Sequence, residues 1–92
     1  MTLLSASEID RRLAGSAWRH DANSIVRELT LADFAAAIAF VNRVADVAEA
    51  ANHHPDLLVH GYNKLRIELS THSDGGLTDA DFALAEQIDA LA

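Results

Sequence analysis

Residues 49–81 have the sequence EAANHHPDLLVHGYNKLRIELSTHSDGGLTDAD, and this stretch predicts two strands, a turn and the start of a helix. Residues 64–70, KLRIELS, alternate polar and apolar side chains, which is typical of a strand with one buried face. Residues 57–59 form a shorter apolar run, and Gly61 separates the two strands. Residues 73–76, SDGG, favour a turn. The buried face is expected to carry Leu65, Ile67 and Leu69, and the open face Tyr62, Lys64, Arg66, Glu68 and, if pairing continues, His72.

The residues before this stretch predict a short helix and a hairpin. Ser5 followed by Glu8 has the form of a capping box, which predicts a helix over residues 5–14. Residues 16–20 and 24–30 are rich in side chains that favour strands, and the turn-like sequence DAN lies between them. We therefore expect these two segments to pair as an antiparallel hairpin.

Two further helices are predicted from caps and apolar spacing. Thr30 with Asp33 has the capping pattern at the start of a long helix that reaches about Ala51, and Thr78 with Asp81 has it at the start of the last helix. In each helix the apolar positions recur at steps of three and four residues, which predicts one buried face. These positions are Leu31, Phe34, Ile38, Val41, Ala45 and Ala48 in the long helix, and Phe82, Ala85, Ile88 and Leu91 in the last one.

The predicted order of elements is αββαββα. Short neighbouring strands with separate helices indicate an α+β fold, a four-stranded antiparallel sheet covered on one face by three helices. We expect residues 1–92 to form a single domain, because 92 residues leave no room for two cores.

Composition excludes several classes of protein. The formal net charge of −7 argues against a nucleic-acid partner, since binding to phosphates needs clustered Lys and Arg. No apolar run is long enough to predict a membrane span or a signal peptide, and the absence of cysteine fits a reducing compartment, so a cytoplasmic location is expected. A core this small would gain from oligomerisation, and apolar residues around Trp18 and the first strands are the expected contact.

Histidines dominate the chemistry that this chain offers. His53 and His54 precede Pro55, which disfavours helical backbone at residue 54 and indicates a corner. Imidazole can give and take protons near neutral pH, because its unperturbed pKa is about 6.5. Residue types alone leave three interpretations of the histidines open: acid/base chemistry, a metal site, or structural hydrogen bonds. Asp81 likewise has a structural interpretation as a helix cap, and Glu49 as a solvated helix end.

Taken together, these residues resemble the signature of the pterin-4a-carbinolamine dehydratases. The resemblance extends to YNK at residues 62–64, LSTH at 69–72 and GLT at 76–78, and in weaker form to most of the chain. The signature positions are Glu49, His53, His54, Pro55, Tyr62, His72 and Asp81.

The resemblance implies a hydro-lyase that removes water from 4a-hydroxytetrahydropterin (4a-hydroxytetrahydrobiopterin) to give quinonoid dihydropterin, in the recycling of the pterin used by aromatic amino acid hydroxylases. It also implies a homodimer or homotetramer that needs no metal or organic cofactor. His53, His54 and His72 match the catalytic residues of the family: His53 and His72 as general acids and bases, His54 mainly to position the pterin. The residues expected to bind or orient the substrate are Glu49, Pro55, Tyr62 and Asp81.

Relatives on the same fold also serve as a dimerisation cofactor of a homeodomain transcription factor, so a non-enzymatic dimerisation or assembly module is the alternative. Three histidines and two carboxylates at these spacings favour the enzyme, because a module that only binds has no use for them.

Overall fold

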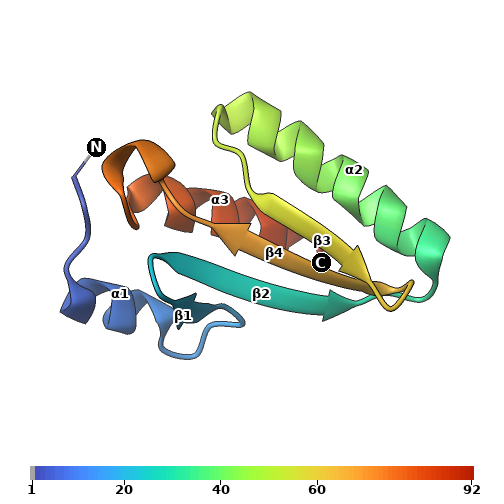
Figure 1. The fold of residues 1–92 in the computed structure, drawn as a ribbon, viewed down its shortest axis with the longest axis horizontal. Coiled ribbons are helices and arrows are strands. Elements are labelled where there is room, and N and C mark those ends of the chain that lie inside the picture. The colour runs from blue at the N-terminus through green and yellow to red at the C-terminus, as the bar shows by residue number, and fades with distance from the viewer. Residues whose placement is uncertain (1) are drawn as a thin grey trace.

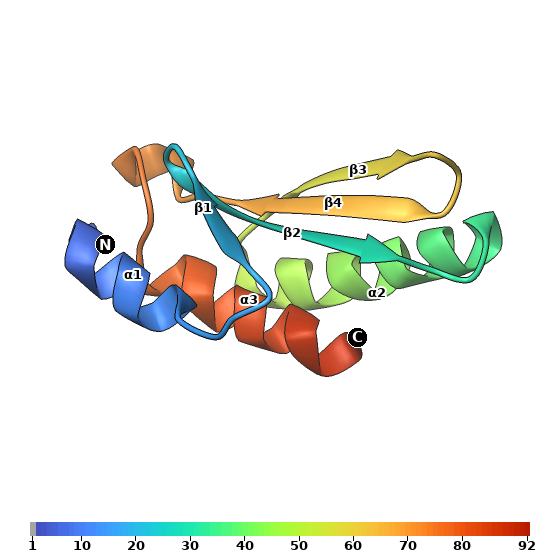
Figure 2. The ribbon, with the colours of Figure 1, turned by 90° about the horizontal axis from the view of Figure 1, so that it is seen from below.

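Residues 2–92, the part of the chain that the computed structural model describes, form a four-stranded antiparallel sheet and three helices, which lie on one face of the sheet (Figures 1 and 2). The predicted fold class and the order αββαββα are confirmed. A 3₁₀ turn, His72–Asp74, stands between the last strand and the last helix. The helices are α1 Ala6–Leu13, α2 Phe34–Ala51 and α3 Asp79–Leu91, and the strands β1 Arg19–Asp21, β2 Ser24–Thr30, β3 Asp56–His60 and β4 Lys64–Leu69.

The sheet has the order β1-β2-β4-β3, so the two longest strands occupy its centre. The predicted alternation in β4 is confirmed, because Leu65, Ile67 and Leu69 are fully buried. Ile25 of β2 pairs with Leu69 and is also fully buried. The predicted hairpin is also present, although its first strand is only three residues long and begins at Arg19.

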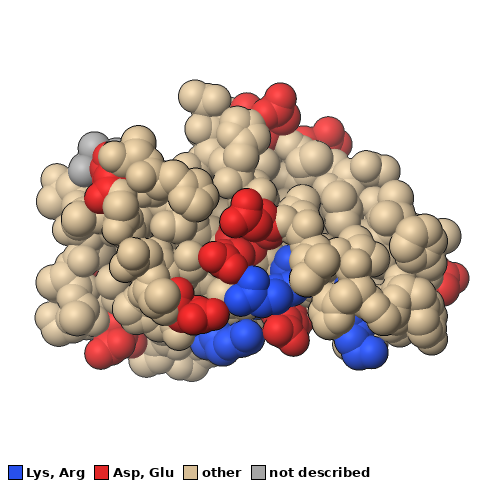
Figure 3. All heavy atoms as spheres, in the orientation of Figure 1, with Lys and Arg blue, Asp and Glu red and all other residues tan. Residues whose placement is uncertain are grey.

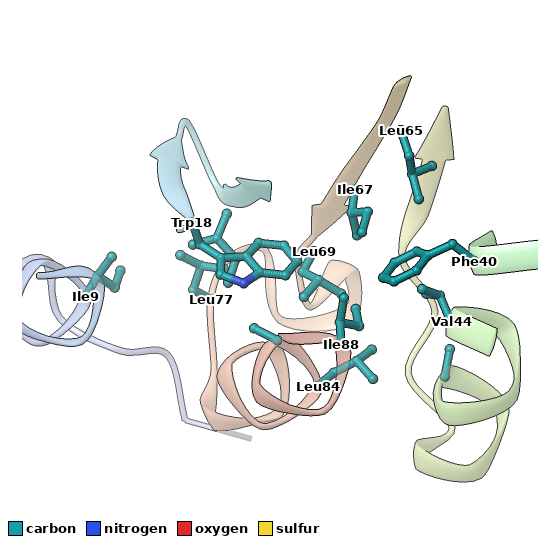
Figure 4. Close-up of a cluster of buried hydrophobic side chains, with 13 residues drawn as sticks. Ile9, Trp18, Phe40, Val44, Leu65, Ile67, Leu69, Leu77, Leu84 and Ile88 are labelled. Carbon is teal, nitrogen blue, oxygen red and sulfur yellow. The ribbon is translucent and has the colours of Figure 1, made fainter. Parts of the chain in front are cut away.

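The core lies between the sheet and the helices (Figure 4). Trp18 belongs to this core with 4% of its surface exposed, and its indole Nε1 donates a hydrogen bond to Asp89 Oδ1 of α3 at 2.8 Å. The contact between copies was expected at apolar residues around Trp18, and Trp18 itself lies in the core of its own chain. Its burial holds the segment just before β1 against α3, because the indole fills core space and its N–H has a partner.

Helix α2 buries a stripe that overlaps the predicted one only in part: Ala48 is buried and Val41 is partly buried against the core, as predicted, but the other buried positions differ. Ala37, Phe40, Val44 and Ala48 are buried, whereas Phe34 is 54% exposed. Because the helix is rich in alanine, apolar residues recur at steps of three and four along more than one stripe, and periodicity alone does not select between them. The stripe centred on the bulky Phe40 is the one that packs on the sheet.

The helix starts follow capping chemistry with two corrections. The side chain of Asp33 accepts a hydrogen bond from Ala36 N at 2.7 Å, so Asp33 itself is the N-cap of α2, and Thr30 ends β2 instead. Ser5 caps α1 as predicted, but the carboxylate of Glu8 pairs with two arginines of the same helix. In α3 the predicted capping box is present, and Leu84 is buried beside the predicted stripe. Within residues 2–92 we find no helix long and apolar enough to span a bilayer.

Candidate active site at the α2–β3 corner

The two adjacent histidines stand at a sharp turn after α2. Asn52, the C-cap, adopts a left-handed conformation with φ of 50°, and its N–H bonds the carbonyls of Ala48 and Glu49. The N–H of His53 then donates to the Ala48 carbonyl at 3.1 Å. These bonds satisfy the last carbonyls of the helix and turn the chain toward β3. Pro55 follows, half-buried, just before β3 begins at Asp56.

His53 pairs with a buried carboxylate on a different element. Its Nε2 lies 2.7 Å from Oδ1 of Asp81, whose side chain is fully buried in the first turn of α3. The His53 side chain is 15% exposed, so the ring borders solvent at one edge. Asp81 is also the third residue of the capping box, in which its Oδ2 accepts from Thr78 N at 2.9 Å. The structural and the functional interpretations of Asp81 therefore describe the same side chain.

His54 pairs with the other predicted carboxylate. Its Nε2 forms a hydrogen bond with Oε2 of Glu49, one turn from the end of α2. Both side chains are well exposed, 58% for His54 and 76% for Glu49. Exposed pairs of this kind are worth about 0 to 1 kcal/mol, because water competes with each partner. The pair thus orients the imidazole without adding much stability.

His72 does not continue the open face of β4. That strand ends at Leu69, and His72 begins the exposed 3₁₀ turn, held by the isolated bridge between Thr71 and Gly76. This corrects the expected strand register, since the chain must leave the sheet to reach α3. His72 still lies next to the corner, because the hydroxyl of the preceding Thr71 donates to Asp81 Oδ2 at 2.8 Å.

Tyr62 lies apart from the histidines. It sits in the turn between β3 and β4 with φ of 58°, not on β4, and is 66% exposed. Figure 1 shows this turn at the opposite end of β3 from the α2–β3 corner. Five strand residues separate the two ends, which is about 17 Å at 3.3 Å per residue. Within one chain, the structure brings together Glu49, His53, His54, Pro55, His72 and Asp81, but not Tyr62.

The open face of the sheet beside the corner carries a charge network (Figure 3). Arg66 lies 2.7 Å from Glu68 and 3.2 Å from Asp21. Hydrogen bonds from Arg66 and then from Ser24 hold the pKa of Glu68 below its usual value, and His72 contributes a smaller Coulombic effect in the same direction. The hydrogen bond to Glu68 likewise raises the pKa of Arg66.

Other features of the surface do not add to the site. One hollow lies between α1 and α3 beside Trp18, and a second beside Leu4 and Gly76; neither is lined by His53, His54 or His72. Residues 2–92 hold no group of three or more His, Cys, Asp or Glu side chains placed to bind a metal ion. His53 and His54 each pair with a different carboxylate, Asp81 and Glu49, and a carboxylate that holds an imidazole suits proton transfer.

Sequence reasoning missed Thr71. Its hydroxyl is buried and bonds both Asp81 and Thr78, yet a single threonine beside His72 has no periodicity or spacing that marks it. The isolated bridge to Gly76 brings it next to the start of α3, and only the fold reveals this contact.

Comparison with known proteins connects this geometry to a family. The sequence model described as "Pterin 4 alpha carbinolamine dehydratase" matches residues 2–91. A Chloroflexus aurantiacus protein named "Putative pterin-4-alpha-carbinolamine dehydratase" is 52% identical over 92 residues, which cover 99% of this chain and 98% of that protein.

Two solved structures resemble the fold. One is described as a transcriptional coactivator/pterin dehydratase from Brucella melitensis, with a TM-score of 0.92 and 31% identity over 99% of both chains. The other is described as a pterin dehydratase-like protein that is a RuBisCO assembly factor in the alpha-carboxysome; its TM-score is 0.66 at 24% identity, over 82% of this chain and 86% of that one. The second likeness concerns the fold alone.

Proposed function

Since this chain belongs to the pterin 4 alpha carbinolamine dehydratase family, we propose that it removes water from a 4a-hydroxytetrahydropterin to give a quinonoid dihydropterin. The observation that carries the proposal is the pairing of His53, at the edge of solvent, with the fully buried Asp81. A histidine held in this way keeps one ring nitrogen for its partner and presents the other to a substrate.

The chemistry needs one proton delivered and one removed. Protonation of the 4a-hydroxyl lets it leave as water when the C4a–O bond breaks, and loss of the ring N–H proton completes the new double bond. We assign these transfers to His53 and His72, which stand on neighbouring segments at the corner. General acid/base assistance of this kind contributes about 10²- to 10⁴-fold.

The remaining residues have supporting roles in the proposal. His54, oriented by Glu49, positions the pterin, and Pro55 shapes the corner that carries both histidines. Tyr62 contributes to substrate binding only if a second copy of the chain brings it near, because it stands at the far end of β3. We expect a homodimer or homotetramer in the cytoplasm, acting in pterin recycling beside an aromatic amino acid hydroxylase, without metal or cofactor.

Stopped-flow measurement tests the proposal directly. A chemically generated 4a-hydroxytetrahydropterin is mixed with wild-type protein, and the quinonoid product is followed by absorbance. We expect acceleration by the wild type and a loss of about 10²-fold or more in His53→Gln and in His72→Gln. The matched control is His60→Gln, which changes a histidine at the other end of β3.

A second function is favoured by one specific observation. Phe34, Ile38, Leu58 and Tyr62 are exposed large apolar residues, and such residues mark protein-binding surfaces where they form one contiguous patch. The solved structure described as a RuBisCO assembly factor has a related fold. If the folded wild type does not accelerate dehydration, the assembly module becomes the better proposal, and light scattering with candidate partners is the next measurement.

A further inference from the structure

The carboxylate that holds His53 is itself held by two threonines. Asp81 Oδ2 accepts from Thr78 N at 2.9 Å and from Thr71 Oγ1 at 2.8 Å, while Oδ1 faces His53 Nε2 at 2.7 Å. Thr78 and Asp81 are fully buried, and Thr71 is 7% exposed. Two donors on Oδ2 leave Oδ1 for the histidine, so the side chain of Asp81 has one preferred orientation.

The direction of the hydroxyl protons follows from counting them. A threonine hydroxyl has a single proton to donate. Thr71 uses its proton on Asp81, so at the 2.8 Å contact between the two hydroxyls Thr71 Oγ1 can only accept. Thr78 Oγ1 in turn accepts from Ala80 N at 3.2 Å. The bonds therefore run in one direction, from the first turn of α3 through Thr78 and Thr71 to Asp81.

This row of hydrogen bonds, from Thr78 through Thr71 to Asp81, bears on which ring nitrogen of His53 carries the proton. A carboxylate accepts hydrogen bonds and does not donate them, so Nε2 of His53 must carry the proton that it shares with Asp81. We propose that Thr71 and Thr78 are positioning residues that keep Asp81 on Nε2 of His53, and that Nδ1 is the ring nitrogen that exchanges protons with the substrate. The last part rests on the proposed function; the hydrogen-bond network does not.

Replacement of Thr71 by valine removes one bond of the row at nearly constant volume. Oδ2 then keeps one donor of two, the bond between the two hydroxyls is lost, and Asp81 holds His53 less firmly. At metal sites, loss of the partner that holds a ligating histidine typically costs about 10- to 100-fold in metal affinity or activity, and Asp81 holds His53 in the same way. We expect kcat to fall about tenfold with little change in KM, and the Nε2 proton of His53 to exchange with water at least about tenfold faster.

The test uses full-length protein labelled with ¹⁵N in histidine. Proton–nitrogen correlations at a pH where the rings are neutral report which nitrogen of His53 carries the proton, and His53→Gln identifies the signal. We expect the wild type to show a slowly exchanging Nε2 proton. Thr71→Val should speed that exchange, and Thr71→Ser, which keeps the hydroxyl, should restore it.

Ser70→Ala is the matched control. Ser70 is the neighbouring buried hydroxyl, and it donates to the Asn23 carbonyl at 2.8 Å, outside the row. Its loss should lower stability and leave the exchange of the His53 proton unchanged.

Three results would overturn the proposal: a proton on Nδ1 of His53 in the wild type, exchange in Thr71→Val within twofold of wild type, or an equal change in Ser70→Ala. The wild-type spectrum decides the first even if Thr71→Val does not fold. Because the spectra need no substrate, they test the network whether or not the protein proves to be a dehydratase.

Discussion

Asp81→Asn tests the candidate site most sharply, because the substitution keeps the shape of the side chain and changes only its hydrogen-bonding capacity. Asparagine has one acceptor oxygen and one NH₂ donor group. Two donors, Thr78 N and Thr71 Oγ1, point at the Oδ2 position, so the amide oxygen must take that side. The NH₂ group then faces His53 Nε2, which must become an acceptor. The proton of His53 is thereby forced onto Nδ1.

The magnitudes follow from the bonds that change. Hydrogen bonds to a charged acceptor are worth about 1.5 to 3 kcal/mol and neutral ones about 1 kcal/mol. A carboxylate in the first turn of a helix adds about 0.3 to 1 kcal/mol. Asp81→Asn should therefore lower the free energy of unfolding by about 2 to 3 kcal/mol. In a serine-protease triad the same change lowers kcat about 10⁴-fold by imposing the wrong tautomer; here we expect about 10²- to 10³-fold.

Three measurements check this expectation: stopped-flow dehydration, urea unfolding, and ¹⁵N spectra of the histidines. Asp89→Asn is the control, because Asp89 lies on the same helix and its carboxylate binds Trp18 Nε1 and Arg27 away from the histidines. It should lose stability and keep normal turnover. A folded Asp81→Asn protein with turnover within about threefold of wild type, or with the His53 proton still on Nε2, would refute the reasoning.

Three further substitutions test other parts of the structure. Glu49→Gln should change the free energy of unfolding by less than about 1 kcal/mol in urea titration, because its pair with His54 is exposed; a loss above about 2 kcal/mol would contradict this. Phe40→Ala should destabilise the protein by about 3 to 5 kcal/mol in the same assay, since Phe40 is the largest fully buried side chain of α2, whereas the exposed Phe34→Ala should cost far less. Glu68→Gln should cost about 1 kcal/mol at pH 7. Because Arg66 and Ser24 lower the pKa of Glu68 in the folded protein, the carboxylate stabilises the fold above its unfolded pKa, and this contribution is lost as pH falls through the folded pKa. The difference in unfolding free energy between wild type and Glu68→Gln should shrink as pH falls from 7 through the folded pKa, and a gap that does not shrink would disprove the assignment.

The sequence predicts which face of an element is buried only where its apolar pattern allows a single buried face. The alternation in β4 has a single phase, since Leu65, Ile67 and Leu69 cannot face water while charged neighbours are buried. In α2 the alanines make several stripes nearly equivalent, and the stripe that faces the sheet is decided by where Phe40 fits. The buried face of β4 is therefore predictable here from local sequence, and that of the alanine-rich α2 is not.

In the candidate site, the sequence predicts the residues, but only the fold shows which atoms are in contact. The family resemblance predicts Asp81 and His53 as site residues, but 28 positions separate them, and only the packing of α3 against the corner pairs them. From the sequence, Asp81 had two alternative interpretations, as a helix cap and as a site residue. A carboxylate has two oxygens, and Oδ2 caps while Oδ1 binds the imidazole. The capping bond and the hydroxyl of Thr71 are what orient the second oxygen, so stability and site geometry depend on the same buried group. A substitution that disturbs one function of Asp81 should consequently disturb the other as well, and for this reason Asp81→Asn must be measured in both stability and turnover.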